Sequence, residues 1–254
     1  MTFQPDLFIL TITFLYGIVI GSFLNVCIYR IPLGESVAKE RSHCMTCGYQ
    51  LRWYDNIPLF SWLMLRGKCR NCKASISPQY PIIEGMTGIL YVLIFAVNGV
   101  NVVSILYCLM ASALLALSVI DFRTYEIPFC FNVFIACLGL IRIALDYENW
   151  SQYVIGFFAI SVFLQILLVA SKGRAIGGGD VKLMAAAGLL IGWKLIVIAF
   201  FIGCILGSVI HIARMKISKA DHVLAMGPYL SMGILIAALW GNDLIEWYLG
   251  LLMI

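Results

Sequence analysis

Two aspartates at the edges of apolar segments are the residues of this sequence best suited to catalysis. Asp121 ends the run "LLALSVID", and Asp180 follows three glycines in "AIGGGDVKLM". Ionisable side chains in or beside membrane segments are costly and therefore suggest a function. Two carboxyls brought to one depth by separate helices can share a proton, activate a water molecule and protonate a leaving amine. The pair therefore suggests hydrolysis of a peptide bond by Asp121 and Asp180.

Each aspartate also has a simpler interpretation, which the sequence leaves open. Asp180 could cap a helix that starts at Val181, because Asp is a preferred N-cap and suits the positive end of a helix. Asp121 could be an interfacial charge paired with Arg123. The three glycines at 177–179 favour the catalytic interpretation, since they allow a second helix or a substrate backbone to approach closely.

Four cysteines form two C-x-x-C pairs in the sizeable polar segment at residues 31–81. Cys44 and Cys47 are followed, after 21 residues, by Cys69 and Cys72. Two such pairs resemble a tetrahedral four-thiolate zinc ribbon, with a spacing just beyond the usual range. The segment has too little core to fold alone, so metal binding would supply its folding free energy. Because a closed four-sulfur site leaves no open position for a substrate, we expect this zinc to be structural.

Other interpretations of the cysteines are two disulfides or four ordinary thiols, and His43 could replace one ligand. A reducing cytoplasmic location argues against disulfides, and cysteines set among Lys and Arg are not explained by burial. The remaining cysteines lie in or beside apolar helices and are expected to be small hydrophobic residues: Cys27, Cys108, Cys130, Cys137 and Cys204.

The elements that must position these residues are membrane helices. The chain has 254 residues, of which 62% are hydrophobic and 12% are charged, against about 25% charged residues in soluble domains. Apolar runs of about 18 residues predict transmembrane helices, and a shorter run at 181–191 predicts a short helix packed within the bundle. The runs lie at 7–28, 82–97, 102–120, 127–145, 153–170, 195–213 and from 223 to 240 or beyond.

The predicted fold is an all-α polytopic membrane protein of about eight transmembrane helices with a small cytoplasmic zinc-ribbon-like insertion after the first helix. Its expected parts are a first transmembrane helix at 1–30, the zinc-binding domain at 31–81 and a multi-helix transmembrane domain at 82–254. Charges near the spans are expected to have minor roles, as a helix-terminus charge at Glu84, a loop charge at Glu126 and a snorkelling side chain at Arg142.

Basic residues indicate the orientation. The four loops on one side of the predicted membrane carry 15 of the 17 Lys and Arg residues, so that side is expected to be cytoplasmic. Both aspartates and the cysteines fall on that side. The net charge of +4 is explained by this topology, so no nucleic-acid partner is expected. The first run lacks a basic segment before it, which indicates a retained span instead of a signal peptide.

Five motifs, in order over nearly the whole chain, resemble the bacterial type IV prepilin peptidases, membrane aspartic proteases of the G-x-G-D type. One of these motifs is the pair of C-x-x-C knuckles already described. The other four are "GSFLNVCIYRIP", "YPIIEG", "IDFRTYEIP" and "GGGDVKLMAAAG". The sequence departs from the usual family pattern at Met45, at Phe129 and in "AMGPYL", without losing a catalytic acid or a zinc ligand.

The resemblance implies a bifunctional enzyme of the bacterial inner membrane. Such an enzyme cleaves the basic leader of type IV prepilins and type II secretion pseudopilins after a glycine, on the cytoplasmic side. It then N-methylates the new terminal residue, usually phenylalanine, with S-adenosylmethionine. Carried over by motif, the catalytic pair is Asp121 and Asp180, and the cysteine tetrad is the metal site. The chain shows no Rossmann-type glycine motif after a strand, so no residues are assigned to the methyl donor.

Two functions from other classes would use the same sequence features. A non-enzymatic membrane scaffold would use the zinc module to dock a cytoplasmic partner, and both aspartates would be structural. A proton-coupled transporter would use the same acids, but transport sites usually lie near the bilayer midplane, whereas both acids are predicted at one face.

Overall fold

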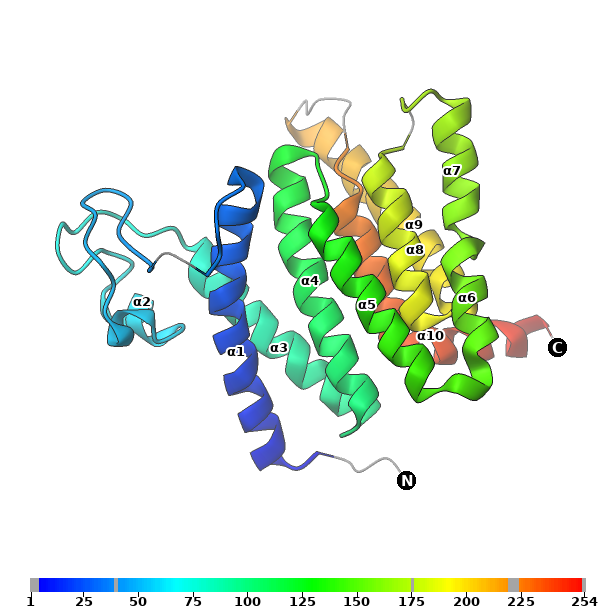
Figure 1. Cartoon of the computed structure of the whole chain (residues 1–254), viewed down its shortest axis with the longest axis horizontal. Helices are drawn as coiled ribbons and strands as arrows, with labels where there is room; N and C mark the ends of the chain where they lie inside the picture. Colours follow the sequence, from blue (N-terminus) through cyan, green and yellow to red (C-terminus); the bar gives the residue numbers. More distant parts are fainter. Residues whose placement is uncertain (1–4, 39–40, 175, 219–223, 253–254) are drawn as a thin grey trace. The chain divides into compact units, whose positions relative to one another are not determined.

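The computed structural model describes residues 5–38, 41–174, 176–218 and 224–252. Helices dominate these residues, and their apolar sequences agree with the all-α prediction (Figure 1). The α-helices are α1 Leu7–Arg30, α2 Phe60–Met64, α3 Gln79–Asn98, α4 Val102–Thr124, α5 Phe129–Leu145, α6 Trp150–Ala159, α7 Ser161–Ala170, α8 Gly178–Ile191, α9 Trp193–Ser218 and α10 Gly227–Leu252. Short 3-10 helices lie at Ile31–Leu33, Trp53–Asn56 and Tyr147–Asn149.

Helices cover most of the described residues of the eight predicted membrane segments. Six stretches of the described chain are long and apolar enough to cross a membrane. The helix α5 has 17 residues and α8 has 14. At 1.5 Å per residue, α8 is about 21 Å long, which is shorter than the roughly 30 Å hydrocarbon core.

The predicted span at 153–170 falls within a stretch, Tyr147–Ala170, that is long and apolar enough to cross a membrane, but its helix is interrupted. The chain forms α6 and α7, which meet at Ile160. Beside the break, the Ser161 hydroxyl donates to the carbonyl of Phe157. Such a hydroxyl bond to the preceding turn often bends a helix.

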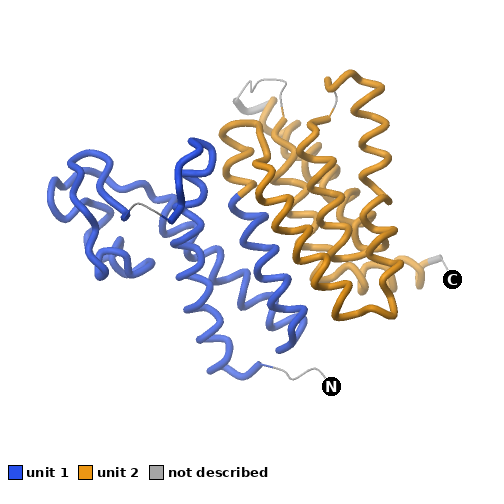
Figure 2. The backbone as a smooth tube through the Cα atoms, viewed as in Figure 1, with its two compact units in different colours: residues 1–116 blue, residues 117–254 orange. Residues whose placement is uncertain are grey.

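The chain divides into two compact units, residues 1–116 and 117–254 (Figure 2). In the first unit α1 packs along α3 (Figure 1). A methyl group at Gly17 would lie 2.6 Å from the Cα of Gly88, and one at Gly21 would lie 2.7 Å from the Cα of Glu84. Small residues therefore bring the two backbones together, as is common between membrane helices.

In the second unit α8 is the central helix, in contact with α5, α6, α7, α9 and α10. Eleven of its 14 residues are buried, which confirms the prediction of a short helix packed within the bundle. The closest approach joins Gly188 of α8 to Gly156 of α6, where an added methyl group on either glycine would overlap the other backbone. The fold thus holds the first turn of α8, which carries Asp180, from several sides.

Candidate active site and cysteine cluster

Asp121 lies in the last turn of α4 and is only 5% exposed. Its backbone carbonyl accepts from the N–H of Tyr125, a residue in the left-handed conformation (φ 57°) that ends the helix and reverses the chain toward α5. Arg123 is exposed and lies two positions away. Residues at i and i+2 do not face each other on a helix, so α4 points these two side chains in different directions.

Asp180 is the third residue of α8 and is 8% exposed. The simpler interpretation, in which it caps a helix starting at Val181, was wrong, because the helix starts at Gly178 and Gly177 is its N-cap. Glycine is accepted at the N-cap, and an acid in the first turn suits the positive helix end. Asp180 therefore lies inside the helix, and the first turn of α8 sets the direction of its side chain.

The three glycines before Asp180 have different surroundings. A methyl group at Gly179 would lie 3.0 Å from the Cβ of Ile127, in the turn that follows Asp121. A methyl group at Gly178 would meet nothing within 4 Å. Gly179 therefore allows the start of α8 to pack on the turn after α4, while Gly178 leaves backbone open to an incoming chain.

Asp121 and Asp180 line the same pocket, together with the two segments that carry them. The pocket has a volume of about 290 Å³, and its lining residues are Asp121, Tyr125, Glu126, Ile127, Gly177, Gly178, Gly179 and Asp180. The two carboxylates are close enough to interact electrostatically. The structure thus brings together the two acids that the sequence pointed out, at an opening with exposed glycine backbone.

A third segment contacts Asp121, and the sequence did not identify it. The backbone N–H of Gly227, the first residue of α10, donates to Oδ2 of Asp121 at 2.9 Å. A methyl group at Gly227 would lie 2.6 Å from the same oxygen. This glycine belongs to "AMGPYL", which stood out only as a departure from a family pattern. Its tight fit makes it a positioning residue for the Asp121 carboxylate.

The four cysteines Cys44, Cys47, Cys69 and Cys72 gather at one point. Their sulfur atoms all lie within 4.8 Å of one another, and Sγ of Cys44 lies 3.8 Å from Sγ of Cys72. Four sulfurs about 2.3 Å from a zinc ion would be separated by about 3.8 Å, whereas a disulfide bond is about 2.05 Å long. The cluster therefore fits a tetrahedral metal ion and does not fit disulfides. His43 is not part of it, and its Nδ1 lies 3.3 Å from the carbonyl of Arg41.

Two matching turns build the cluster. In the first, the Cys44 N–H donates to the Tyr49 carbonyl at 2.9 Å and Gly48 takes the left-handed conformation. In the second, the Cys69 N–H donates to the Ala74 carbonyl at 2.8 Å and Lys73 takes that conformation. Backbone N–H groups of Cys47 and Thr46 lower the pKa of Cys44 to about 6, so this thiol is readily present as the thiolate that a metal needs.

An ion pair between a buried carboxylate and a half-exposed arginine supports the turns. The Asp55 side chain is 1% exposed and accepts from Nε of Arg70 at 2.7 Å. It also accepts from the N–H of Arg52 and the hydroxyl of Tyr49, at 3.2 and 3.4 Å. Burial alone would raise the pKa of Asp55, but the hydrogen bonds from Arg70 and Arg52 hold it below its ordinary value. Asp55 thereby joins residues next to both cysteine pairs.

Glu84 also differs from its expected role as a helix-terminus charge. It lies one and a half turns inside α3, is 6% exposed, and accepts from the backbone N–H of Leu59 at 2.7 Å. Leu59 has a positive φ of 60° and directly precedes α2. The glutamate therefore ties the cysteine-containing segment to the helix that follows it.

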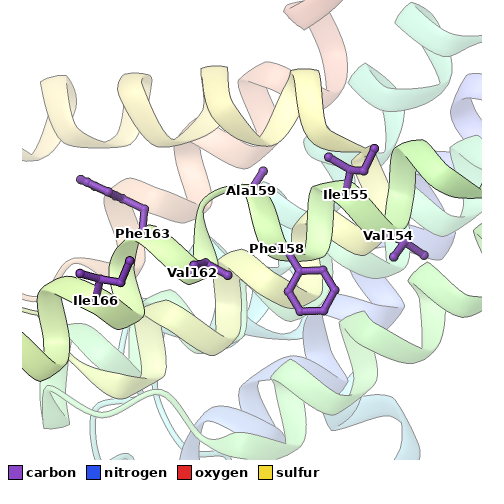
Figure 3. A pocket seen from close by; sticks show the side chains of 7 residues that line it. All are labelled: Val154, Ile155, Phe158, Ala159, Val162, Phe163 and Ile166. Carbon is purple, nitrogen blue, oxygen red and sulfur yellow. The ribbon is translucent and has the colours of Figure 1, made fainter.

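A larger hollow, of about 540 Å³, runs along α6 and α7 across their break (Figure 3). It is lined by Val154, Ile155, Phe158, Ala159, Val162, Phe163 and Ile166. None of these side chains can hold a proton, a metal or a charged ligand. The hollow therefore does not fit S-adenosylmethionine, which needs polar partners for its adenosine and its amino-acid group.

Comparison with known proteins gives matches over most of the chain. Residues 15–97 match the bacterial peptidase A24 N-terminal domain, and residues 108–212 match the type IV leader peptidase family. A "Prepilin leader peptidase/N-methyltransferase" of Stutzerimonas stutzeri is 33% identical, over 92% of this chain and 91% of its own. Proteins with the same name from Aeromonas salmonicida and Bacillus subtilis are each 30% identical, over 96% and 94% of this chain and 94% and 98% of their own. No solved structure matches the chain.

Proposed function

The chain belongs to the type IV leader peptidase family, and we propose that Asp121 and Asp180 are the two carboxyls with which it hydrolyses the leader peptide bond of its substrates. The protein is a prepilin peptidase with N-methyltransferase activity. One observation carries the assignment of the two residues: two buried aspartates from separate helices line one small pocket beside open glycine backbone.

The mechanism needs one carboxyl ionised and the other protonated. The ionised carboxylate takes a proton from a water molecule held between the two groups, and the water oxygen attacks the scissile carbonyl carbon. The protonated carboxyl donates a hydrogen bond to the developing oxyanion, and a proton then passes to the leaving amine as the C–N bond breaks. No covalent intermediate forms. The short approach of Gly227 fixes Asp121 for this chemistry, and the first turn of α8 fixes Asp180.

The substrates we propose are type IV prepilins and type II secretion pseudopilins, cleaved after a glycine at the cytoplasmic face of the bacterial inner membrane. The distribution of Lys and Arg supports that sidedness. A substrate with an apolar helix would lie in the lipid beside the bundle and present its leader junction at the pocket. The open backbone at Gly178 supports this, because an extended peptide can approach it without meeting a side chain.

We further propose that residues 31–81 form a structural zinc-binding domain and residues 82–254 the peptidase domain. Zinc would be held by Cys44, Cys47, Cys69 and Cys72, and their spacing supports that ion. A bound zinc ion would cross-link the two turns and add folding free energy to a segment with little core of its own. S-adenosylmethionine would supply the methyl group for the new terminal residue.

The test uses the purified full-length enzyme with a type IV prepilin and S-adenosylmethionine, and mass spectrometry reads leader loss and methyl addition separately. Asp121→Asn and Asp180→Asn are each expected to lower the cleavage rate by a factor of about 10² to 10⁴. Asp243→Asn is the matched control, because Asp243 is an exposed acid of α10. Cleavage at the control rate by either of the first two variants would contradict the assignment.

The scaffold considered as an alternative is not favoured. Relatives that match the chain over nearly its full length carry an enzyme name. A scaffold would also leave the two buried acids in one pocket without a role. The same asparagine variants separate the two functions, since a scaffold would keep its partner binding and show no dependence on either aspartate.

A further inference from the structure

The short helix α2 of the cysteine-containing segment exposes an apolar face. Phe60, Leu63 and Met64 are 57%, 64% and 68% exposed. They occupy positions i, i+3 and i+4, which lie on one side of a helix. Trp62 is directed differently, since its indole N–H donates to the carbonyl of Ile76 at 3.3 Å. The helix therefore packs into the segment through one side and presents three large apolar side chains on another.

The attachment of α2 sets its level relative to the membrane. Leu59, immediately before α2, donates its N–H to Glu84 at 2.7 Å. Glu84 is the sixth residue of α3, a candidate membrane span, so it lies about 7.5 Å along the axis from the start of that helix. Interfacial helices bury their apolar faces to a depth of about 5–10 Å. The hydrogen bond therefore holds the start of α2 within the interfacial layer.

The surface of α3 at this level is itself apolar and exposed. Ile82 and Met86, on either side of Glu84 in the sequence, are 53% and 44% exposed. In a membrane span such residues face lipid. Leu59, the residue before α2, lies against this part of α3, since a methyl group at Gly85 would lie 3.9 Å from its Cδ2. The start of α2 is therefore held beside a part of α3 whose exposed side chains would face lipid.

The charges near α2 match an anionic membrane surface. Residues 51–73 contain five basic residues and one acid, and that acid, Asp55, is paired with Arg70. Arg66 and Lys68 follow α2 directly and are exposed. Basic residues next to an apolar helical face are typical of segments that bind anionic lipid headgroups.

We propose that α2 is an interfacial membrane anchor of the cysteine-containing segment. Phe60, Leu63 and Met64 insert at the boundary between headgroups and acyl chains, and Arg66 and Lys68 contact lipid phosphates. The anchor lies in the leaflet at which α1 ends and α3 begins. It restrains the segment at a point separate from its two connections to the spans. The proposal depends on α3 crossing the membrane and does not depend on the two-aspartate mechanism.

The test places a photoreactive residue, p-benzoylphenylalanine, at position 63 of the full-length protein in nanodiscs of phosphatidylethanolamine and phosphatidylglycerol. A second protein carries it at Met45, which is equally exposed at 64% but belongs to the first cysteine turn. Bound zinc, measured in both samples, reports whether the segment has folded. After irradiation, mass spectrometry is expected to find lipid adducts several-fold more often at position 63 than at position 45.

Two results would overturn the proposal. Equal lipid adducts at both positions, in zinc-containing protein, would show that α2 is no closer to lipid than an ordinary exposed loop. Attachment of position 63 to added prepilin in place of lipid would show that the face binds a protein. Replacing phosphatidylglycerol by phosphatidylcholine is expected to lower the adduct yield at position 63 several-fold, and an unchanged yield would contradict the role of Arg66 and Lys68.

Discussion

Gly227→Ala is expected to disable cleavage without removing either aspartate. The new methyl group would lie 2.6 Å from Oδ2 of Asp121, and an ordinary contact starts at 3.4 Å. The carboxylate must therefore move by about 0.8 Å or give up its hydrogen bond from the Gly227 N–H. A misplacement of about 1 Å in a catalytic group can cost about 100-fold in rate, which corresponds to about 2.7 kcal/mol of activation free energy.

The assay is prepilin cleavage by purified enzyme, with kcat and KM determined separately. We expect the loss to fall mainly on kcat, because the substitution moves a carboxylate that we propose acts on the reacting atoms and leaves the open backbone at Gly178 unchanged. Gly207→Ala is the matched control, since its methyl group would meet its nearest neighbour, Tyr229, at 3.5 Å. Thermal unfolding of both variants shows whether the bundle is intact.

A Gly227→Ala enzyme as active as the Gly207→Ala enzyme would refute the reasoning about Asp121. It would mean that the carboxylate does not need the position in which α10 holds it. Loss of activity together with a large drop in unfolding temperature would instead indicate damaged packing. Comparing the cleavage rate and the unfolding temperature with those of Asp121→Asn then separates a misplaced carboxylate from damaged packing. Asp121→Asn keeps the side-chain shape and removes the charge.

Three further predictions concern the zinc segment and the central helix. Cys69→Ser, at the most buried ligand position, is expected to lower bound zinc from about one ion per chain to nearly none, as measured by metal analysis of the purified protein. Arg70→Met is expected to make zinc release begin at a higher pH on acidification. Asp55 stabilises the fold above the ordinary aspartate pKa and loses that effect as the pH falls through its lowered pKa in the folded protein. The variant raises the pKa of Asp55 in the folded protein, so the stabilisation is lost at a higher pH. A chromogenic chelator follows the release, and identical curves would contradict the role of the pair. Gly188→Ala is expected to prevent stable folding, because its methyl group would overlap the backbone of Gly156; recovery of monodisperse protein at the wild-type level would contradict it.

Much of the fold could be predicted because long apolar runs are local features. Each predicted membrane segment is mainly helical over its described residues, and α8 is buried as its small and apolar residues indicated. The break between α6 and α7 was not predictable, because the run at 153–170 is predominantly apolar and contains no proline, and a serine that bonds to the preceding turn, as Ser161 does, bends a helix often but not always.

The candidate site was only partly predictable. Asp121 and Asp180 were identifiable because an acid beside an apolar run is rare and costly. Gly227 was not, because its role depends on α10 returning to a carboxylate 106 positions earlier. The local sequence predicts only a helix-terminus charge at Glu84, since nothing in it shows that the backbone of Leu59 would contact this glutamate. In both cases a hydrogen bond joins a backbone N–H to a carboxylate in a distant part of the sequence.

The short, enclosed α8 constrains how the protein is assembled in the membrane. A helix of about 21 Å cannot span the hydrocarbon layer of about 30 Å as an independent segment. Its Gly188 face is also complete only when α6 is already beside it. During synthesis α8 is therefore expected to pack against helices made earlier, and Asp180 reaches Asp121 only when it does. The pocket is lined by the turn after α4 and the start of α8, so it is expected to form only when these two segments have come together.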